Sequence, residues 1–406
     1  MPKIQNMGAS TPTLVAHPTR EALAADAVTR ILDIIEHVLS ERTIAHISLT
    51  GGTMGIATLK AWAENERVKD IDWSRVHFWF SDERYVPERS PERNDGQAIE
   101  ALLAPLLSHG LVVGNVHRMG PSDIFTGLEA AAEHYAFEMR DYAGSAPAVS
   151  VQMPEGATEL PLAGGHGGGA GHEHGGSGGS GGCGCGGGGC GSSAPEQSIE
   201  ETTLDEFDAE AAEPAGGCGC GGGGCGGGGG GQWPAPVFDI TLLGMGPDGH
   251  IASLFPGRKQ VLLGTGLPED PVEGGKAVTV MVSDSPKPPA ERVSVTLPII
   301  NNSRHVFFLI TGEDKQDATS RLLAGAKLDA EDLNAQLLLE TPAVGARGKK
   351  QTLIFATEES LAPENRPQGS GSELHQDKRV EPRIDTYPGL FSMVLNQPEM
   401  VPEVVL

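Results

Sequence analysis

The sequence contains no apolar run that approaches the length needed to span a bilayer. Near its N-terminus it also lacks a basic segment followed by an apolar core, which is the pattern of a secretory signal. These two absences argue against an integral membrane protein and against a secreted one. We therefore expect a soluble protein of the cytoplasm.

Positively charged residues are scarce relative to acidic ones. The chain has 29 Lys and Arg residues against 54 Asp and Glu residues, a formal net charge of -25. This balance argues against general binding to nucleic acid or to an acidic membrane surface. A small anionic ligand is still compatible with it, because a local basic pocket can lie within an acidic protein.

Cysteine is absent except in two short glycine-rich blocks. The motif Gly-Gly-Cys-Gly-Cys-Gly-Gly-Gly-Gly-Cys stands at 181–190 and again at 216–225, and it holds all six cysteines. Both blocks lie within a region, 146–234, that consists mostly of Gly, Ser, Ala, Glu and Pro. Such a segment cannot bury enough apolar surface to offset the entropy lost on ordering. We therefore predict a long disordered insertion at 146–234.

The clustered thiols allow two further interpretations. Together with His166, His172 and His174 they suit a soft metal such as zinc or copper. However, the C-x-C-x4-C spacing is not that of a zinc ribbon, and glycine flanks give no preorganisation. Disulfides are disfavoured in a cytoplasmic setting. We favour an insertion without a metal site, and the alternative is weak metal binding, with a non-catalytic metal-buffering or sugar-phosphate-sensing role for the chain.

Outside the insertion, strand and helix patterns alternate along the chain. Short apolar or β-branched runs predict strands at 13–16, 44–49, 76–80, 116–119, 237–243, 277–282, 293–297, 305–311 and 353–356. Apolar residues at helical spacing predict helices at 20–41, 54–63, from 93 through 103, 128–142, 251–254, around 322–323 and 331–340. This alternation predicts an α/β domain of three layers with a mostly parallel sheet. We assign one domain to 11–145 and 235–360, interrupted by the insertion, and a polar tail to 361–406.

Polar and glycine-rich residues follow several of the predicted strands directly. Asp248-Gly249-His250 lies in a glycine turn after the strand at 237–243, and Gly51-Gly52-Thr53 comes between a strand and a helix. Ser81 to Arg84 and Gly312 to Lys315 follow two other strands. Ligands of open α/β sheets bind at the carboxyl ends of the strands, and a glycine turn before a helix suits an anion. Each motif alone is also compatible with a plain turn or a solvated loop.

In combination, these motifs resemble 6-phosphogluconolactonase. The resemblance rests on the segments at 244–257, 81–87 with 93–94, 289–296 and 311–315, which have the order and spacing of that family. It implies a Rossmann-like fold related to glucosamine-6-phosphate deaminase, and hydrolysis of 6-phospho-D-glucono-1,5-lactone in the oxidative pentose phosphate pathway. The alternative is an aldose-ketose isomerase or deaminase. Deaminases carry a Phe-Asn-Glu-Pro type of segment after Asp-Gly-His, whereas this chain has Ser253-Leu-Phe-Pro256.

Three features depart from that family. They are the insertion, the strand around Thr352 to Ala356 without the usual tryptophan and aspartate, and the tail beyond 361. None of them includes a motif of the expected site. The predicted enzyme needs no cofactor and no metal, and its only expected partner is the sugar-phosphate lactone.

The resemblance and the residue chemistry together give an expected site. His250 is the expected general base for water attack, because a histidine titrates near neutral pH, and Asp248 orients it. Arg84 or the N–H groups of the glycine turns stabilise the oxyanion. The remaining substrate-binding and phosphate-binding candidates are Gly51, Gly52, Thr53, Asp82, Asn94, Gly246, Arg292 and Lys315, with Asn94 assigned to a sugar hydroxyl.

Overall fold

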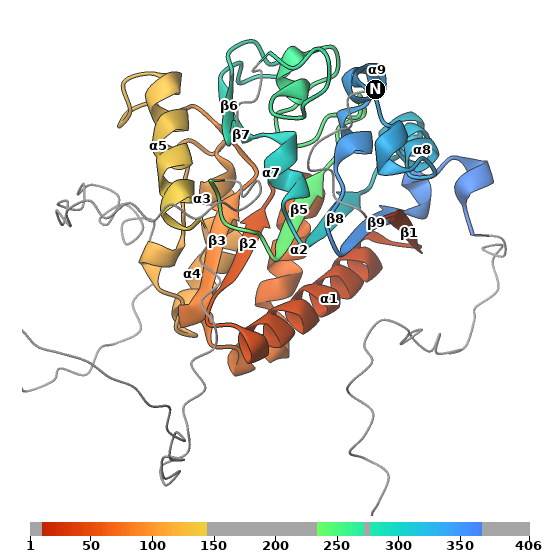
Figure 1. Cartoon of the computed structure of the whole chain (residues 1–406). Coiled ribbons are helices and arrows are strands. Elements are labelled where there is room, and N and C mark those ends of the chain that lie inside the picture. Colours follow the sequence, from red (N-terminus) through yellow and green to blue (C-terminus); the bar gives the residue numbers. More distant parts are fainter. Residues whose placement is uncertain (1–9, 144–233, 272–276, 368–406) are drawn as a thin grey trace, which may run out of the picture. The chain divides into compact units, whose positions relative to one another are not determined.

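The computed structural model of the chain describes residues 10–143, 234–271 and 277–367 (Figure 1). All six cysteines and all of the predicted disordered insertion except Pro234 lie outside these residues, as does most of the predicted tail. The strands are β1 Pro12–His17, β2 Ala45–Leu49, β3 Val76–Phe80, β4 Asp82–Arg84, β5 Ile240–Gly244, β6 Thr279–Val282, β7 Arg292–Val295, β8 His305–Ile310 and β9 Gln351–Thr357. The α-helices are α1 Arg20–Glu41, α2 Gly52–Ala63, α3 Asn94–Ala98, α4 Ala104–Leu107, α5 Leu128–Asp141, α7 Leu297–Asn301, α8 Gln316–Gly325 and α9 Ala335–Glu340.

The main sheet has six parallel strands in the order β1-β9-β8-β5-β2-β3. The predicted α/β fold with a mostly parallel sheet is therefore confirmed. A second sheet, which the sequence patterns did not predict, has three antiparallel strands in the order β4-β7-β6. It joins Asp82–Arg84, which directly follows β3, to the segment that starts at Arg292.

Helices cover both faces of the main sheet and create two apolar cores. Successive residues of a strand point to opposite faces, and β8 shows this clearly. Phe307 and Leu309 pack in the core shared with α1 and α2, whereas Val306, Phe308 and Ile310 pack in the core shared with α5, α7 and α8. Figure 1 shows α1 lying along one face of the sheet. The packed region reaches Leu361, whose side chain is fully buried.

Two predicted elements are wrong. Residues 251–254 form no helix: Ile251 and Leu254 pair in an isolated bridge around a tight turn. A residue of β7 fixes this turn, because the Ser253 N–H donates to Ser294 Oγ at 3.2 Å. The predicted strand at 116–119 is reduced to one bridge between Val116 and Phe78. Farther along, the carbonyl of Met119 instead accepts a hydrogen bond from Arg93 Nη2 at 2.5 Å.

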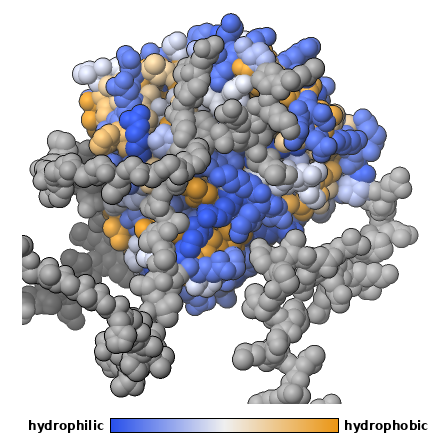
Figure 2. Space-filling view, viewed as in Figure 1, coloured by the Kyte–Doolittle hydropathy of each residue, from blue (hydrophilic) through white to orange (hydrophobic). Residues whose placement is uncertain are grey.

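The surface of the described residues is mostly polar. On the face shown in Figure 2, hydrophilic side chains predominate and hydrophobic ones are scattered between them. The large apolar side chains that are exposed in this part of the chain are Val112, Ile124, Phe137 and Met281. Within the same ranges, no helix combines the length and the apolar composition that a membrane span requires.

Candidate active site

A cavity of about 480 Å³ lies at the edge of the main sheet where the strands end. Because the strands are parallel, their carboxyl ends meet there, and the segments after β2, β5 and β8 all contribute to the wall. Ten of the eleven predicted site residues line it: Gly51, Gly52, Thr53, Asp82, Arg84, Asn94, Gly246, His250, Arg292 and Lys315. The eleventh, Asp248, is not among the lining residues but is hydrogen-bonded to His250.

His250, in the wall of the cavity, forms a hydrogen-bonded pair with Asp248. His250 Nδ1 lies 2.5 Å from Asp248 Oδ1, and the His250 side chain is 16% exposed. Burial alone would raise the pKa of Asp248, but the hydrogen bond and the charge of His250 outweigh burial and hold that pKa below its usual range. An ionised Asp248 accepts a hydrogen bond from Nδ1–H, which leaves Nε2 of the neutral ring free to accept a proton.

Gly246 makes room for this pair. A Cβ atom at Gly246 would lie 2.1 Å from His250 Nδ1 and 2.4 Å from Asp248 Oδ1, closer than any side chain can approach. The Gly246 N–H also donates to the carbonyl of His250 at 2.9 Å. Gly246 therefore lines the cavity, as predicted, but its missing side chain is required by the histidine and the aspartate.

The first turn of α2 forms another part of the wall. Its N-cap, Gly51, provides no side-chain cap for the helix, and Gly52 has a φ of 81°, which favours glycine. The first N–H groups of a helix have no partner within the helix, and the helix dipole adds positive potential. Residues 51–53 therefore present the features that bind an anion.

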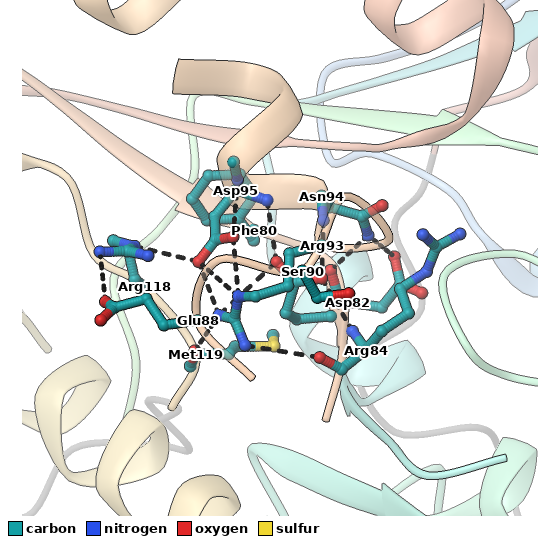
Figure 3. Close-up of polar contacts among 12 residues, drawn as sticks. Phe80, Asp82, Arg84, Glu88, Ser90, Arg93, Asn94, Asp95, Arg118 and Met119 are labelled. Atoms are coloured by element: carbon teal, nitrogen blue, oxygen red, sulfur yellow. Dashed lines mark hydrogen bonds and ion pairs between the residues drawn. The ribbon is translucent and has the colours of Figure 1, made fainter. Parts of the chain in front are cut away.

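A buried polar network, drawn in Figure 3, packs next to the first turn of α2. Asn94 Nδ2 donates to the Asp82 carbonyl at 2.9 Å, which directs Asn94 Oδ1 toward Gly51. The fully buried Arg93 donates to Asp95 and to the Met119 carbonyl. Glu83 accepts the N–H groups of Asn94 and Asp95 at 2.7 and 2.8 Å. Together these bonds fix the start of α3 against the cavity.

Five cationic side chains line the cavity, against two carboxylates. The cations are Arg20, Arg84, Lys287, Arg292 and Lys315, and the carboxylates are Asp82 and Asp314. The cavity is thus locally basic in a chain whose formal net charge is -25. Burial lowers the pKa of Lys315, whose Nζ also donates to the Met245 carbonyl at 2.6 Å.

Two of these cations, Arg20 and Lys287, were not predicted as site residues. In the sequence, Arg20 is only the first residue of a predicted helix. Because β1 is parallel to β9, α1 begins at the edge of the sheet where the cavity lies. Glu359 accepts a hydrogen bond from Arg20 Nη2 at 3.3 Å, at the end of β9. The position of β1 in the sheet is the signal that would have identified Arg20.

Arg292 supports the loop that carries Lys287. Its guanidinium donates to the carbonyls of Pro289 at 3.1 Å, Lys287 at 2.9 Å and Pro288 at 3.2 Å. Lys287 Nζ in turn lies 3.8 Å from Asp248 Oδ1. Arg292 lines the cavity as predicted, yet most of its donors are used within this loop. The same contacts place Lys287 beside the His250–Asp248 pair.

Comparison with known proteins identifies the family. Residues 18–155 and 228–354 match the family model described as Glucosamine-6-phosphate isomerases/6-phosphogluconolactonase. The 6-phosphogluconolactonase of Streptomyces coelicolor is 32% identical over 346 residues, which cover 84% of this chain and 91% of that protein. This chain belongs to the glucosamine-6-phosphate isomerase/6-phosphogluconolactonase family. The 6-phosphogluconolactonase of Mycobacterium tuberculosis is 31% identical, over 85% of this chain and 95% of that protein.

Solved structures show the same fold. The 6-phosphogluconolactonase from Trypanosoma cruzi has a TM-score of 0.53 at 18% identity, covering 89% of this chain and 99% of the other. The enzyme from Trypanosoma brucei has a TM-score of 0.50 at 21% identity, covering 86% of this chain and 98% of the other. The fold expected from the resemblance is therefore confirmed.

Proposed function

We propose that this chain hydrolyses 6-phospho-D-glucono-1,5-lactone to 6-phosphogluconate, as a step of the oxidative pentose phosphate pathway. The relatives that match most of the chain are named 6-phosphogluconolactonase. The observation that carries the proposal is the His250–Asp248 pair in the wall of a basic cavity. A histidine held by an ionised carboxylate supplies a general base, and the cations supply an anion site.

In the proposed reaction, His250 Nε2 accepts a proton from a water molecule as the water oxygen bonds to the lactone carbonyl carbon. The carbonyl π electrons move to its oxygen, which becomes an oxyanion. When that intermediate collapses, the bond between the carbonyl carbon and the ring oxygen breaks. The imidazolium then returns its proton to the departing ring oxygen, so that one water is consumed and one carboxylic acid forms.

We assign the 6-phosphate to the start of α2. The N–H groups at Gly52 and Thr53 supply donors, and their helix dipole favours negative charge. Arg20 and Arg84 each line a surface groove that also includes Thr53, which supports placing both cations at the phosphate end. Lys315 is the third candidate. This assignment moves Arg84 from the predicted catalytic role to phosphate binding.

The lactone ring then lies toward His250 and Lys287. Because Lys287 Nζ is 3.8 Å from Asp248, its positive charge favours the ionised aspartate that holds His250 in the required tautomer. Arg292 contributes by holding the Lys287 loop through its carbonyl groups. We propose no cofactor and no metal for this reaction, since every step uses groups of the described residues.

The rate of lactone hydrolysis above the spontaneous background tests this proposal. We expect fast hydrolysis that a chelator does not reduce, and a loss of about a hundredfold or more in kcat for His250→Asn. His109→Asn is the matched control, because His109 is exposed and lies outside the cavity. Glucosamine 6-phosphate is offered in parallel. Ammonia release from it without lactone hydrolysis would assign the chain to the deaminase branch of the family.

A further inference from the structure

The backbone of Ala252 is unusual within the described residues. Ala252 has a φ of 46° and is the one residue there, apart from glycines, with a positive φ. It is 9% exposed, it lines the cavity, and it lies two residues after His250. A side chain in this left-handed region is unfavourable and persists only where surrounding contacts impose it. Such conformations are concentrated at functional sites.

Contacts on both sides impose this conformation. Before Ala252, the carbonyl of His250 accepts the Gly246 N–H at 2.9 Å. After it, Ser253 Oγ donates to Asp82 Oδ2 at 2.6 Å. The Ser253 N–H donates to Ser294 Oγ at 3.2 Å. Residue 252 is therefore held between the loop of the catalytic histidine and two strands of the antiparallel sheet.

The N–H of Ala252 has no hydrogen-bond acceptor among the described residues. Its neighbours do: the Ser253 N–H donates to Ser294, and the Leu254 N–H donates to the Ile251 carbonyl at 2.9 Å. A buried N–H without a partner is rare and costly. Because Ala252 is 9% exposed and lines the cavity, we expect a group bound in the cavity to be the acceptor of this N–H.

We propose that the main-chain N–H of Ala252 donates a hydrogen bond to the lactone carbonyl oxygen and stabilises the oxyanion that forms there. This inference rests on the proposed function. Its place in the chain, two residues from the general base, suits a donor to the atom next to the attacked carbon. Among the side chains, Arg84 Nη1 is bonded to the Glu92 carbonyl, and Arg292 is bonded to three loop carbonyls.

Replacing the peptide N–H by an ester oxygen tests the donor directly. The full chain is made with lactic acid in place of Ala252, which leaves the methyl side chain and replaces the N–H by an ester oxygen. We expect kcat for 6-phosphogluconolactone to fall about a hundredfold to a thousandfold, as for other main-chain or side-chain oxyanion donors, with KM changed less than about threefold. A kcat within threefold of wild type would overturn the proposal.

A matched ester controls for the side effect of the substitution. The ester at 252 also weakens the Ile251 carbonyl, which accepts the Leu254 N–H. An ester at Leu254 removes that same hydrogen bond and leaves the Ala252 N–H in place. We expect it to keep kcat within about threefold, since the oxyanion donor is intact. An equal loss of kcat at 252 and 254 would show a structural effect and refute the donor role.

If the chain with the ester does not fold, two ordinary substitutions of Ala252 test the same donor role. Ala252→Gly keeps the N–H and tolerates the positive φ, so its kcat should exceed that of Ala252→Val at least tenfold. Ala252→Val disfavours that φ, so kcat should fall at least tenfold. Equal kcat for the two variants would overturn the proposal. An inactive wild type in the same assay would refute the lactonase function itself and with it this inference, whereas an active wild type with a fully active ester chain would refute this inference alone.

Discussion

A Cβ atom at Gly51 would lie 1.9 Å from Asn94 Oδ1. The Asn94 amide occupies the place where a side chain of Gly51 would stand, at the N-cap of α2. Asn94 is held there by its hydrogen bond to Asp82, and Glu83 fixes its backbone. Two residues far apart in the sequence thus shape the proposed phosphate site jointly, one by its absent side chain and the other by its amide.

We expect Gly51→Ala to weaken phosphate binding selectively. The added methyl group must displace Asn94 or the first turn of α2, a clash that typically costs about 1–3 kcal/mol. KM for 6-phosphogluconolactone should rise about tenfold or more, because 1.4 kcal/mol corresponds to a factor of ten. Steady-state kinetics with this substrate and with unphosphorylated glucono-1,5-lactone measure the effect, which should be much smaller for the latter.

Gly96→Ala is the matched control for this substitution. A Cβ at Gly96 would meet nothing within 4 Å, and Gly96 lies in α3, two residues after Asn94. Its kinetic constants should match those of the wild type for both lactones. Equal losses for the phosphorylated and the unphosphorylated lactone in Gly51→Ala would contradict a phosphate-specific role of this turn.

The strand ends could be predicted from the sequence because each is a local pattern. The turns at Gly51 and Gly246 follow short apolar runs, and a parallel sheet brings all such ends to one edge. Ten of the eleven predicted site residues line one cavity for this reason. The helix expected at 251–254 failed because Ser253 is bonded to residues of two other strands, which no local pattern shows.

The antiparallel sheet and its consequences could not be predicted locally. β4 pairs with β7 so that Arg84 lies opposite Arg292, a pairing across more than half of the chain. This pairing brings to the cavity the proline-rich loop whose three carbonyls accept hydrogen bonds from Arg292. The sequence alone predicts Arg292 as a phosphate ligand and gives no reason to place Lys287 in the site.

Arg292→Lys should impair catalysis through the Lys287 loop. Lysine cannot reproduce the planar set of donors that reaches three carbonyls, and each hydrogen bond from a charged group is worth about 1.5–3 kcal/mol. We expect kcat/KM to fall about tenfold to a hundredfold. Arg258→Lys is the control, because Arg258 is 38% exposed and bonds to Asp284 just before the loop. Equal activity of Arg292→Lys and Arg258→Lys would exclude this role.

Replacing all six cysteines by serine should leave the lactonase reaction unchanged. Every predicted site residue lies between 51 and 94 or between 246 and 315, whereas the cysteine blocks lie at 181–190 and 216–225. We expect kcat/KM within about twofold of the wild type, a margin below 0.5 kcal/mol. The same value should be found before and after dialysis against a chelator. A loss in the serine variant, or in the dialysed wild type, would tie the insertion to catalysis.

His305 should make the fold sensitive to mild acid. It is 6% exposed at the start of β8, and burial lowers its pKa to about 4. An unfolded histidine titrates near 6.5, so between pH 6.5 and 4 the unfolded chain binds more protons than the folded chain. The free energy of unfolding should therefore fall as the pH decreases through that window, by at most about 3 kcal/mol for this residue.

Urea unfolding of the wild type and of His305→Gln, measured from pH 7 to 4, tests this linkage. Glutamine does not titrate, so the variant should lose less stability across the window, even if it is less stable at pH 7. His109→Asn serves as the control, because His109 is exposed and its removal should leave the pH dependence of the wild type. Parallel stability curves for the wild type and His305→Gln would show that the acid sensitivity arises at other groups.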